Sequence, residues 1–239
     1  MRLRLYEFGP RTGPHTYRIV QPRHPLRHTT LNDPLHDRWG YLLGDHDGLS
    51  RLAGLFAFAA FSRHTVVRVP LRESLPRTFF PGVPVDIVLV HHLLGLRPSR
   101  RPGLRAGLRR GTPLTVRTDE RRTAAHAAAW RKEGEDRNWR SSQWLRPAVH
   151  ARTLFLFGSR DVFAEAATCF EEAAGYGPLS KHAAKGLDVL GSSLSPLFEP
   201  DHRWDRPELD IGFQAYPPYR HFRPPGRPAS RRSRTAASP

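Results

Sequence analysis

The stretch that decides the fold is RTLFLFGSRDVFAEAATCFEEAAGYG, residues 152–177. Its first part is almost continuously apolar, which is the pattern of a strand covered on both faces. A Gly-Ser turn follows, and after it apolar side chains recur at the spacing of a helix. We therefore predict a buried strand, a turn and an amphipathic helix that stops near Gly175. The apolar face of this helix consists of Phe163, Ala166, Ala167, Phe170, Ala173 and Ala174.

Strand and helix patterns are interspersed along the rest of the chain. Two pairs of successive strands have no helix pattern between them, so we predict an α/β or α+β fold in which helices pack on a mixed β-sheet. Residues 1–216 are predicted to form a single folded domain, and the Pro- and Arg-rich residues 217–239 a disordered basic tail. Further strands are predicted at residues 2–8, 16–20, 64–70, 85–90, 113–118 and 208–216.

Three further helices are predicted. Residues 48–62 are apolar on nearly all sides and should form a buried helix, with Asp47 accepting a backbone hydrogen bond as its cap. Residues 119–133 combine high helix propensity with an acidic first turn. Residues 178–191 are predicted as a helix that begins at a proline. The segment from residue 21 to about Gly48 is rich in Pro, His and Asp and is predicted as a loop.

The charge of the chain is strongly positive, with 38 basic against 22 acidic residues and a net charge of +16. Such a balance is typical of proteins that bind nucleic acid or another polyanion. Lysine occurs only three times, however, and an arginine-rich composition also results from GC-rich coding. Two segments without acids, residues 95–111 and the tail, carry most of the excess charge, so the argument for a polyanion partner depends on them.

The first of these segments provides candidate polyanion-binding residues. Arginine pairs bidentately with phosphate, and a basic segment of this kind binds nucleic acid without sequence preference and with strong salt dependence. The leading hypothesis is therefore a soluble basic protein that binds nucleic acid or another polyanion non-specifically. The candidate residues are Arg97, Arg100, Arg101, Arg105, Arg109 and Arg110.

The turn at residues 158–161 indicates a second class of function. A Gly-Ser turn between a strand and a helix presents backbone N–H groups and a hydroxyl at the positive end of the helix, which suits a phosphate. The turn resembles the Gly-Ser corner of nucleotidyltransferases, and the resemblance implies two metal-binding carboxylates on a following strand. The alternative hypothesis is a small phosphate- or nucleotide-handling enzyme, with candidate catalytic residues Ser159, Asp161, Glu208 and Asp210. In a purely structural alternative, Ser159 or Asp161 caps the helix and Arg160 faces solvent.

Histidine and acidic side chains gather in residues 33–47. Such side chains suit zinc, manganese or iron, and the candidate ligands are His36, Asp37, Asp45 and His46. Their spacing matches no metal motif beyond a D-x-D-G fragment, so we assign neither a metal nor a cofactor.

Two histidines, His91 and His92, end the most apolar strand, where a ligand crevice is expected. The alternation of side chains along a strand predicts that the two rings point to opposite faces of the sheet.

The remaining observations concern the cellular setting. The single cysteine, Cys169, cannot form an internal disulfide, which favours a reducing cytoplasm. The first eight residues lack the apolar core of a signal peptide. The longest apolar run, residues 52–61, is about half as long as the ~20 residues that cross a bilayer, so no membrane span is predicted. A third class of function, an interaction protein without catalysis, is also open.

Overall fold

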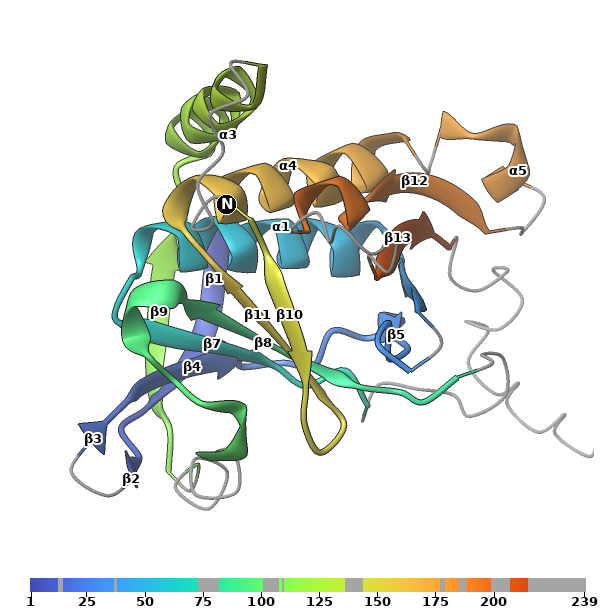
Figure 1. Ribbon diagram of the computed structural model, residues 1–239. Helices are drawn as coiled ribbons and strands as arrows, with labels where there is room; N and C mark the ends of the chain where they lie inside the picture. Colours follow the sequence, from blue (N-terminus) through green and yellow to red (C-terminus); the bar gives the residue numbers. More distant parts are fainter. Residues whose placement is uncertain are drawn as a thin grey trace, which may run out of the picture.

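The computed structural model contains two main β-sheets and a stack of helices (Figure 1). This arrangement confirms the predicted fold class, a mixed sheet with helices packed on it. The predicted tail, residues 217–239, lies outside the described part of the chain. The structure describes residues 1–12, 15–36, 38–72, 82–100, 108, 110–135, 144–176, 179–184, 188–198 and 207–214.

The larger sheet has seven strands and is mixed. The neighbours β11 and β8 run parallel, as do β7 and β4, and every other pair in the sheet is antiparallel. In spatial order the strands are β10 (Arg146–Val149), β11 (Thr153–Gly158), β8 (Asp86–His91), β7 (Thr65–Val69), β4 (Arg18–Pro22), β1 (Arg2–Phe8) and β9 (Thr112–Arg117).

A smaller sheet of four strands joins segments that are far apart in the sequence. Its two central strands, β13 and β6, run parallel. In spatial order its strands are β12 (Val189–Ser193), β13 (Glu208–Phe213), β6 (Trp39–Gly44) and β5 (Thr30–Leu31). A short hairpin of β2 (Arg11–Thr12) and β3 (His15–Thr16) lies apart from both sheets.

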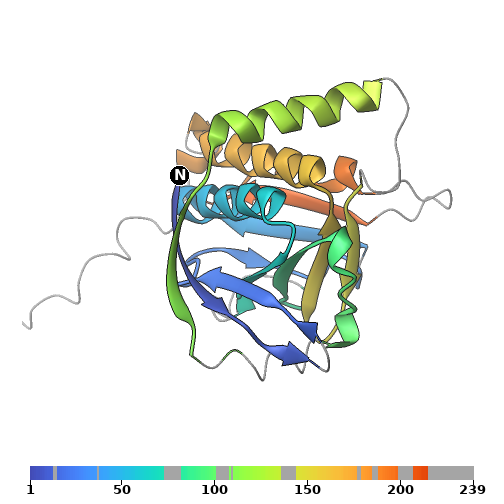
Figure 2. The same cartoon turned by 90° about the vertical axis from the view of Figure 1, so that its left-hand side faces the viewer.

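Three helices cover one face of the larger sheet in successive layers (Figure 2). Helix α1 (His46–Phe61) lies against the strands, α4 (Arg160–Tyr176) packs on α1, and α3 (Glu120–Glu135) packs on α4. The chain also forms a short helix α5 (Lys181–Ala184) and the 3-10 turns η2 (His92–Leu94), η3 (Pro98–Arg100) and η6 (Ser195–Leu197).

The main apolar core lies between the larger sheet, α1, α4 and the smaller sheet. The ring of Phe56 in α1 contacts two rings of α4, with centroids 6.1 Å from Phe163 and 4.9 Å from Phe170. All six residues of the predicted apolar face of α4 are buried, so the strand and helix predicted from residues 152–177 are confirmed. A second apolar cluster lies on the other face of the sheet, around Ile19, Val88 and Phe155.

Two predictions of local structure are wrong. The segment from residue 21 to Gly48 contains β5 and β6 rather than only a loop, because β6 pairs with β13 from the other end of the chain. Residues 178–191 do not form one helix: α5 is short, and the chain enters strand β12 at Val189 because β13 offers a pairing partner. Long-range pairing overrides local propensity in both places.

The cap of α1 also differs from the prediction. Asp45, two residues earlier than predicted, accepts a hydrogen bond from the backbone N–H of Gly48 at 2.8 Å. Asp47 lies in the first turn instead and pairs with Arg51 at 3.1 Å, one turn along the helix. Within the described residues, no helix is long and apolar enough to cross a membrane.

Candidate functional site

A crevice of about 600 Å³ opens at the ends of the central strands of the larger sheet. The parallel strands β8 and β11 both end there, at His91 and Gly158, and β7 begins there at Thr65. Arg18, the first residue of β4, lies opposite Thr65 in the β4–β7 register, at the same strand ends. Ligands of α/β sheets bind outside the carboxyl ends of parallel strands, and this volume lies in the range of about 300–1,000 Å³ that is usual for ligand pockets.

The amino end of α4 forms one wall of the crevice, which Ser159, Arg160 and Asp161 line. The first internal bond of the helix runs from the N–H of Phe163 to the carbonyl oxygen of Ser159, at 3.2 Å. Helix geometry leaves the preceding N–H groups without a partner inside the helix. Together with the helix dipole they give this wall a partial positive charge.

Arginines from four different elements line the crevice: Arg18 at the start of β4, Arg63 after α1, Arg122 in α3 and Arg160 in α4. Asp161 is the one carboxylate among the lining residues that the structure describes. Because the cations outnumber the carboxylate, the potential inside the crevice is positive and favours an anion.

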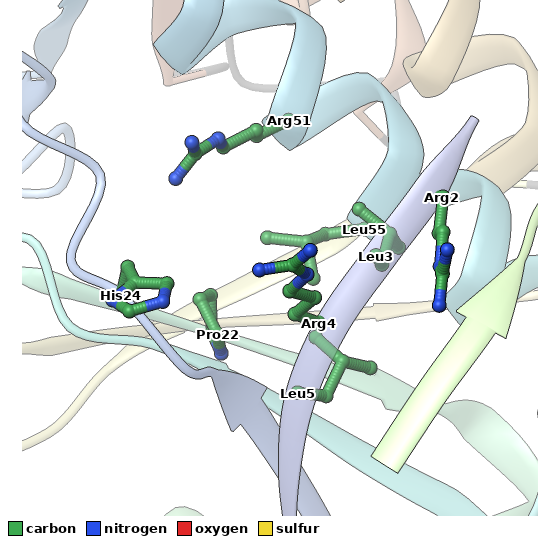
Figure 3. Close-up of a pocket in the computed structure, with 8 residues that line it drawn as sticks. All are labelled: Arg2, Leu3, Arg4, Leu5, Pro22, His24, Arg51 and Leu55. Carbon is green, nitrogen blue, oxygen red and sulfur yellow. The ribbon is translucent and has the colours of Figure 1, made fainter. Parts of the chain in front are cut away.

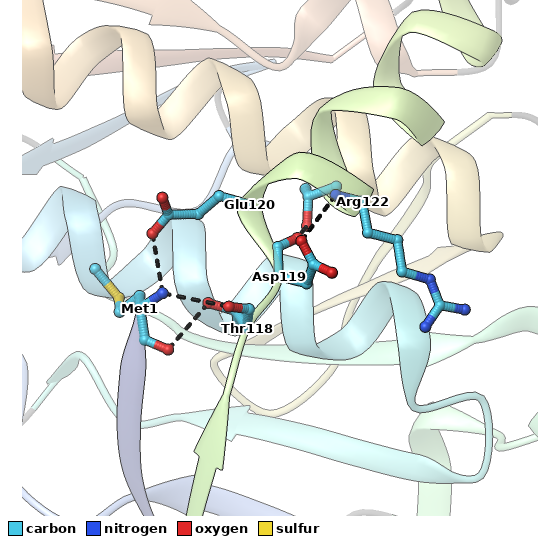
Figure 4. A network of polar contacts seen from close by, with 6 residues as sticks. Met1, Thr118, Asp119, Glu120 and Arg122 are labelled. Carbon is cyan, nitrogen blue, oxygen red and sulfur yellow. Dashed lines mark hydrogen bonds and ion pairs between the residues drawn. The ribbon is translucent and has the colours of Figure 1, made fainter.

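Arg122 is held in place by the start of α3 (Figure 4). The carboxylate of Asp119 caps the helix by accepting a hydrogen bond from the N–H of Arg122 at 3.0 Å. The N–H of Thr118 donates to the carbonyl oxygen of Met1 at 2.9 Å, which ties this turn to β1. The guanidinium of Arg122 extends away from this network and lies 4.2 Å from the ring centroid of Phe61, another residue of the crevice.

His91 lines the floor of the crevice and is only 7% exposed. Its Nδ1 accepts a hydrogen bond from the N–H of Leu93 at 3.4 Å. Burial lowers the pKa of His91 to about 4, and the nearby cationic groups, His92 and Arg63 first among them, add to this effect. The ring is therefore uncharged near pH 7.

The prediction that the two neighbouring histidines point to opposite faces of the sheet is wrong. The rings of His91 and His92 stack, with centroids 4.6 Å apart and planes 29° apart. The chain leaves β8 at His91 and enters the turn η2, so the alternation of a strand ends between these residues. His92 Nδ1 lies 3.2 Å from the carbonyl oxygen of Gly158 at the end of β11.

The carboxylate of Asp161 is paired with Arg160 and contacts His126. Its Oδ1 accepts a hydrogen bond from Arg160 Nε at 3.0 Å and lies 2.7 Å from His126 Nδ1. His126 belongs to α3, so this contact also links α3 to α4. Arg18 is paired as well, since its guanidinium donates a hydrogen bond to Glu7 Oε2 at 2.8 Å. Arg63 and Arg122 are therefore the crevice arginines that no described carboxylate pairs with, and they are available to an anion.

The structure brings together only two of the four candidate catalytic residues. Ser159 and Asp161 line the crevice, whereas Glu208 and Asp210 lie on β13 in the smaller sheet and do not line it. Asp210 Oδ2 accepts a hydrogen bond from Trp39 Nε1 at 3.1 Å. Among the described residues, the Gly-Ser corner therefore has no pair of carboxylates beside it of the kind that the nucleotidyltransferase resemblance implies.

The candidate metal ligands that the structure describes do not form one site, and two of them have separate structural contacts. Asp45 caps α1, and His46 Nδ1 lies 3.1 Å from the carbonyl oxygen of Ala174. His36 is exposed, and Asp37 lies outside the described residues. No group of three or more His, Cys, Asp or Glu side chains in the described part of the chain could hold a metal ion.

The candidate polyanion-binding arginines are described only in part. Arg97 and Arg110 are exposed, and Arg100 belongs to the turn η3. Arg101, Arg105 and Arg109 lie outside the described residues. Binding of a polyanion through this segment stays a prediction.

Sequence reasoning missed Arg18, Arg63, Arg122 and His126. None of them stands in a motif, and they are spread over more than a hundred residues of the chain. Only the meeting of the end of α1, the start of α3 and the start of β4 assembles them. The useful signals were the Gly-Ser turn at residues 158–161 and the position of His91 at the end of an apolar strand, where a crevice was expected.

The chain matches no protein-family model, no curated protein and no solved structure. A function has to be inferred from the geometry and charge of the crevice.

Proposed function

We propose that the crevice binds a small molecule that carries a phosphate group. The observation that carries this proposal is the convergence of four arginines on one cavity at the amino end of α4. Arginine binds phosphate oxygens bidentately, and the free N–H groups of a helix N-terminus favour the same oxygens. His91 supports the proposal as a buried polar ring on the floor of the same cavity.

The size of the crevice and its apolar walls favour a phosphate ester over free phosphate. Phe61 and Leu93 line the cavity beside the arginines, and the side chain of Leu93 is largely exposed. Ligand pockets combine apolar surface with a few polar groups that fix orientation. An organic group attached to the phosphate would cover this apolar surface.

The proposal is restricted to binding. Nucleotidyl transfer requires carboxylates that hold metal ions next to the transferred phosphate, and the candidates Glu208 and Asp210 belong to the smaller sheet. The geometry around Ser159 and Asp161 supports recognition of an anion and supplies no reason to propose a reaction.

The test is titration of the protein with pyrophosphate and with AMP at low salt, with binding measured by calorimetry and by amide NMR. We expect shifts at the amides of residues 159–162, and affinity that falls as salt rises. Replacing Arg122 by Gln should weaken binding about tenfold, since a hydrogen bond to a charged group contributes about 1.5–3 kcal/mol and the exposure of Arg122 to solvent keeps the effect at the lower end. Arg121→Gln is the matched control, because Arg121 is an exposed neighbour in α3 that does not line the crevice.

A second readout comes from His91. Nearby cations help to lower its pKa, so a bound anion should raise that pKa from about 4 toward its ordinary value. The ring protons of His91, titrated by NMR with and without pyrophosphate, report this change. The proposal is contradicted if Arg121→Gln and Arg122→Gln weaken pyrophosphate binding equally. It is also contradicted if the pKa of His91 does not change when pyrophosphate is added.

A further inference from the structure

A second cavity, of about 320 Å³, lies at the opposite end of β4 from the crevice, beside the first half of α1 (Figure 3). Its lining combines buried apolar residues with basic ones, and within the described part of the chain it shares no residue with the crevice. The apolar residues are Leu3, Leu5, Pro22 and Leu55, and the basic residues are Arg2, Arg4, His24 and Arg51.

The cavity is a consequence of strand pairing. Strand β1 pairs with β9 from Arg2 to Glu7, but with β4 only from Leu5 to Phe8. Strand β4 ends at Pro22, whose nitrogen cannot donate to a ladder. The next residue bonds once more to β1, through the N–H of Arg23 and the carbonyl oxygen of Arg4 at 2.9 Å. Among the described residues, no strand continues on the β4 side of the first residues of β1, and the space beside α1 on that side stays open.

Basic side chains from three elements surround this space. Arg4 in β1, His24 after β4 and Arg51 in α1 project toward one another in Figure 3. No acidic residue is among the described residues that line the cavity. Asp47 lies just outside and pairs with Arg51 at 3.1 Å, but both side chains are well exposed. An exposed pair of this kind is weak, so a bound anion can compete for Arg51.

We propose that this cavity is a second ligand site, which binds a small organic oxyanion. The oxyanion, a carboxylate or a phosphate, would lie between Arg4 and Arg51, since guanidinium groups pair bidentately with both. A short aliphatic or aromatic group would rest on the apolar floor of Leu3, Leu5 and Leu55. The volume is at the lower end of the range for ligand pockets, which favours a compact ligand. This site does not depend on the function proposed for the crevice.

The probes are hexanoate, phenyl phosphate and the neutral analogue hexan-1-ol, each titrated at low salt and followed by methyl and amide NMR. We expect at least one of the two anions to cause saturable shifts at Leu3, Leu5 and Leu55, and the alcohol to bind at least about tenfold more weakly because it makes no charge-assisted bond. The anion that binds more tightly identifies the preferred head group.

Four substitutions test the proposal. Arg4→Gln should weaken anion binding about tenfold, as expected for loss of one charge-assisted contact. Asp47→Asn should tighten binding several-fold, because it releases Arg51 from its partner. Arg117→Gln is the matched control, since Arg117 is exposed, pairs with Arg2 across the strands and lines neither cavity. Arg122→Gln, in the crevice, should leave this site unchanged.

The outcomes are decisive in both directions. Saturable anion binding that Arg4→Gln weakens and Asp47→Asn strengthens supports the site. The proposal is overturned if neither anion causes saturable shifts, if hexan-1-ol binds as tightly, or if Arg117→Gln has the same effect as Arg4→Gln. Circular dichroism checks that the variants fold, and Arg51→Gln replaces Arg4→Gln should the latter unfold.

Discussion

Asp86 is a buried carboxylate that fixes the amino end of β8. Its side chain is 2% exposed, and its oxygens accept hydrogen bonds from the N–H groups of Leu71 and Arg72, both at 3.1 Å. The guanidinium of Arg72 pairs with it at 3.0 Å, and that of Arg68 lies 3.6 Å away. A buried charge is tolerated only when it is paired and hydrogen-bonded in this way, so Asp86 fastens the segment after β7 to the neighbouring strand.

Replacing Asp86 by Ala should lower the free energy of unfolding by about 3–5 kcal/mol, the usual cost of removing one partner of a buried ion pair. The change leaves Arg72 and two backbone donors without their acceptor. Urea unfolding followed by circular dichroism measures the loss. Asp47→Asn is the comparison, because it removes an exposed pair and should cost about 1 kcal/mol or less. Similar costs for the two variants would argue against the role assigned to Asp86.

His91 predicts a dependence of stability on pH. The pKa of its ring is about 4 in the folded chain, below its ordinary value of 6.5. Between these values the unfolded chain binds more protons, so stability is fully present above pH 6.5 and falls as the pH drops toward 4. The loss between pH 7 and pH 5 should be about 2 kcal/mol.

The variant His91→Asn tests this dependence. An asparagine Oδ1 can replace Nδ1 as the acceptor for Leu93 but does not titrate. Urea unfolding at pH 7 and at pH 5 should show a larger loss for the wild-type chain than for the variant. If both lose the same stability, protonation of His91 is not the cause.

At the scale of elements, the contact between β12 and α4 depends on a residue without a side chain. Gly191 lies at a shift of register between β12 and β13, and a Cβ there would come within 2.7 Å of the Cα of Ala173. The strand therefore lies directly on the helix backbone. The bulge and the glycine together allow this close approach.

Gly191→Ala should lower the free energy of unfolding by about 1–3 kcal/mol, the usual cost of overpacking. Gly175→Ala is the matched comparison, because Gly175 lies in α4 and a Cβ there meets nothing within 4 Å. That change should be neutral or stabilise by up to about 1 kcal/mol, since alanine is the better helix former. Thermal unfolding of the two variants separates steric contact from helix propensity, and a loss in Gly175→Ala would contradict the reasoning.

At the scale of the whole molecule, the net charge of +16 still predicts a polyanion partner. Affinity for a fluorescent single-stranded oligonucleotide should fall steeply with salt, with a logarithmic slope of about −0.7 for each phosphate contact. Changing the six arginines between Arg97 and Arg110 to Gln should reduce both the affinity and this slope. The same change to the six arginines between Arg220 and Arg234 measures how much the tail, the second basic segment, contributes to the affinity. Binding that is absent at low salt, or insensitive to salt, would rule out this partner.

The sequence by itself determined the elements whose patterns are local. The apolar run of β11 and the helical spacing of α4 were predicted within a residue or two, because burial of one face or two leaves a periodic trace. The mixed character of the fold followed from strand pairs without a helix between them. Strands β6 and β12 were missed because their partner β13 lies elsewhere in the chain.

Only the tertiary structure decided where the candidate sites lie. The nucleotidyltransferase-like corner at Ser159 was visible in the sequence, but its presumed partner Asp210 belongs to another sheet. The arginines that do surround the corner, such as Arg18 and Arg122, carry no local signal because an exposed arginine looks the same wherever it points. Secondary structure depends largely on residues that are close in the sequence, whereas a binding site is made by residues that only tertiary packing brings together.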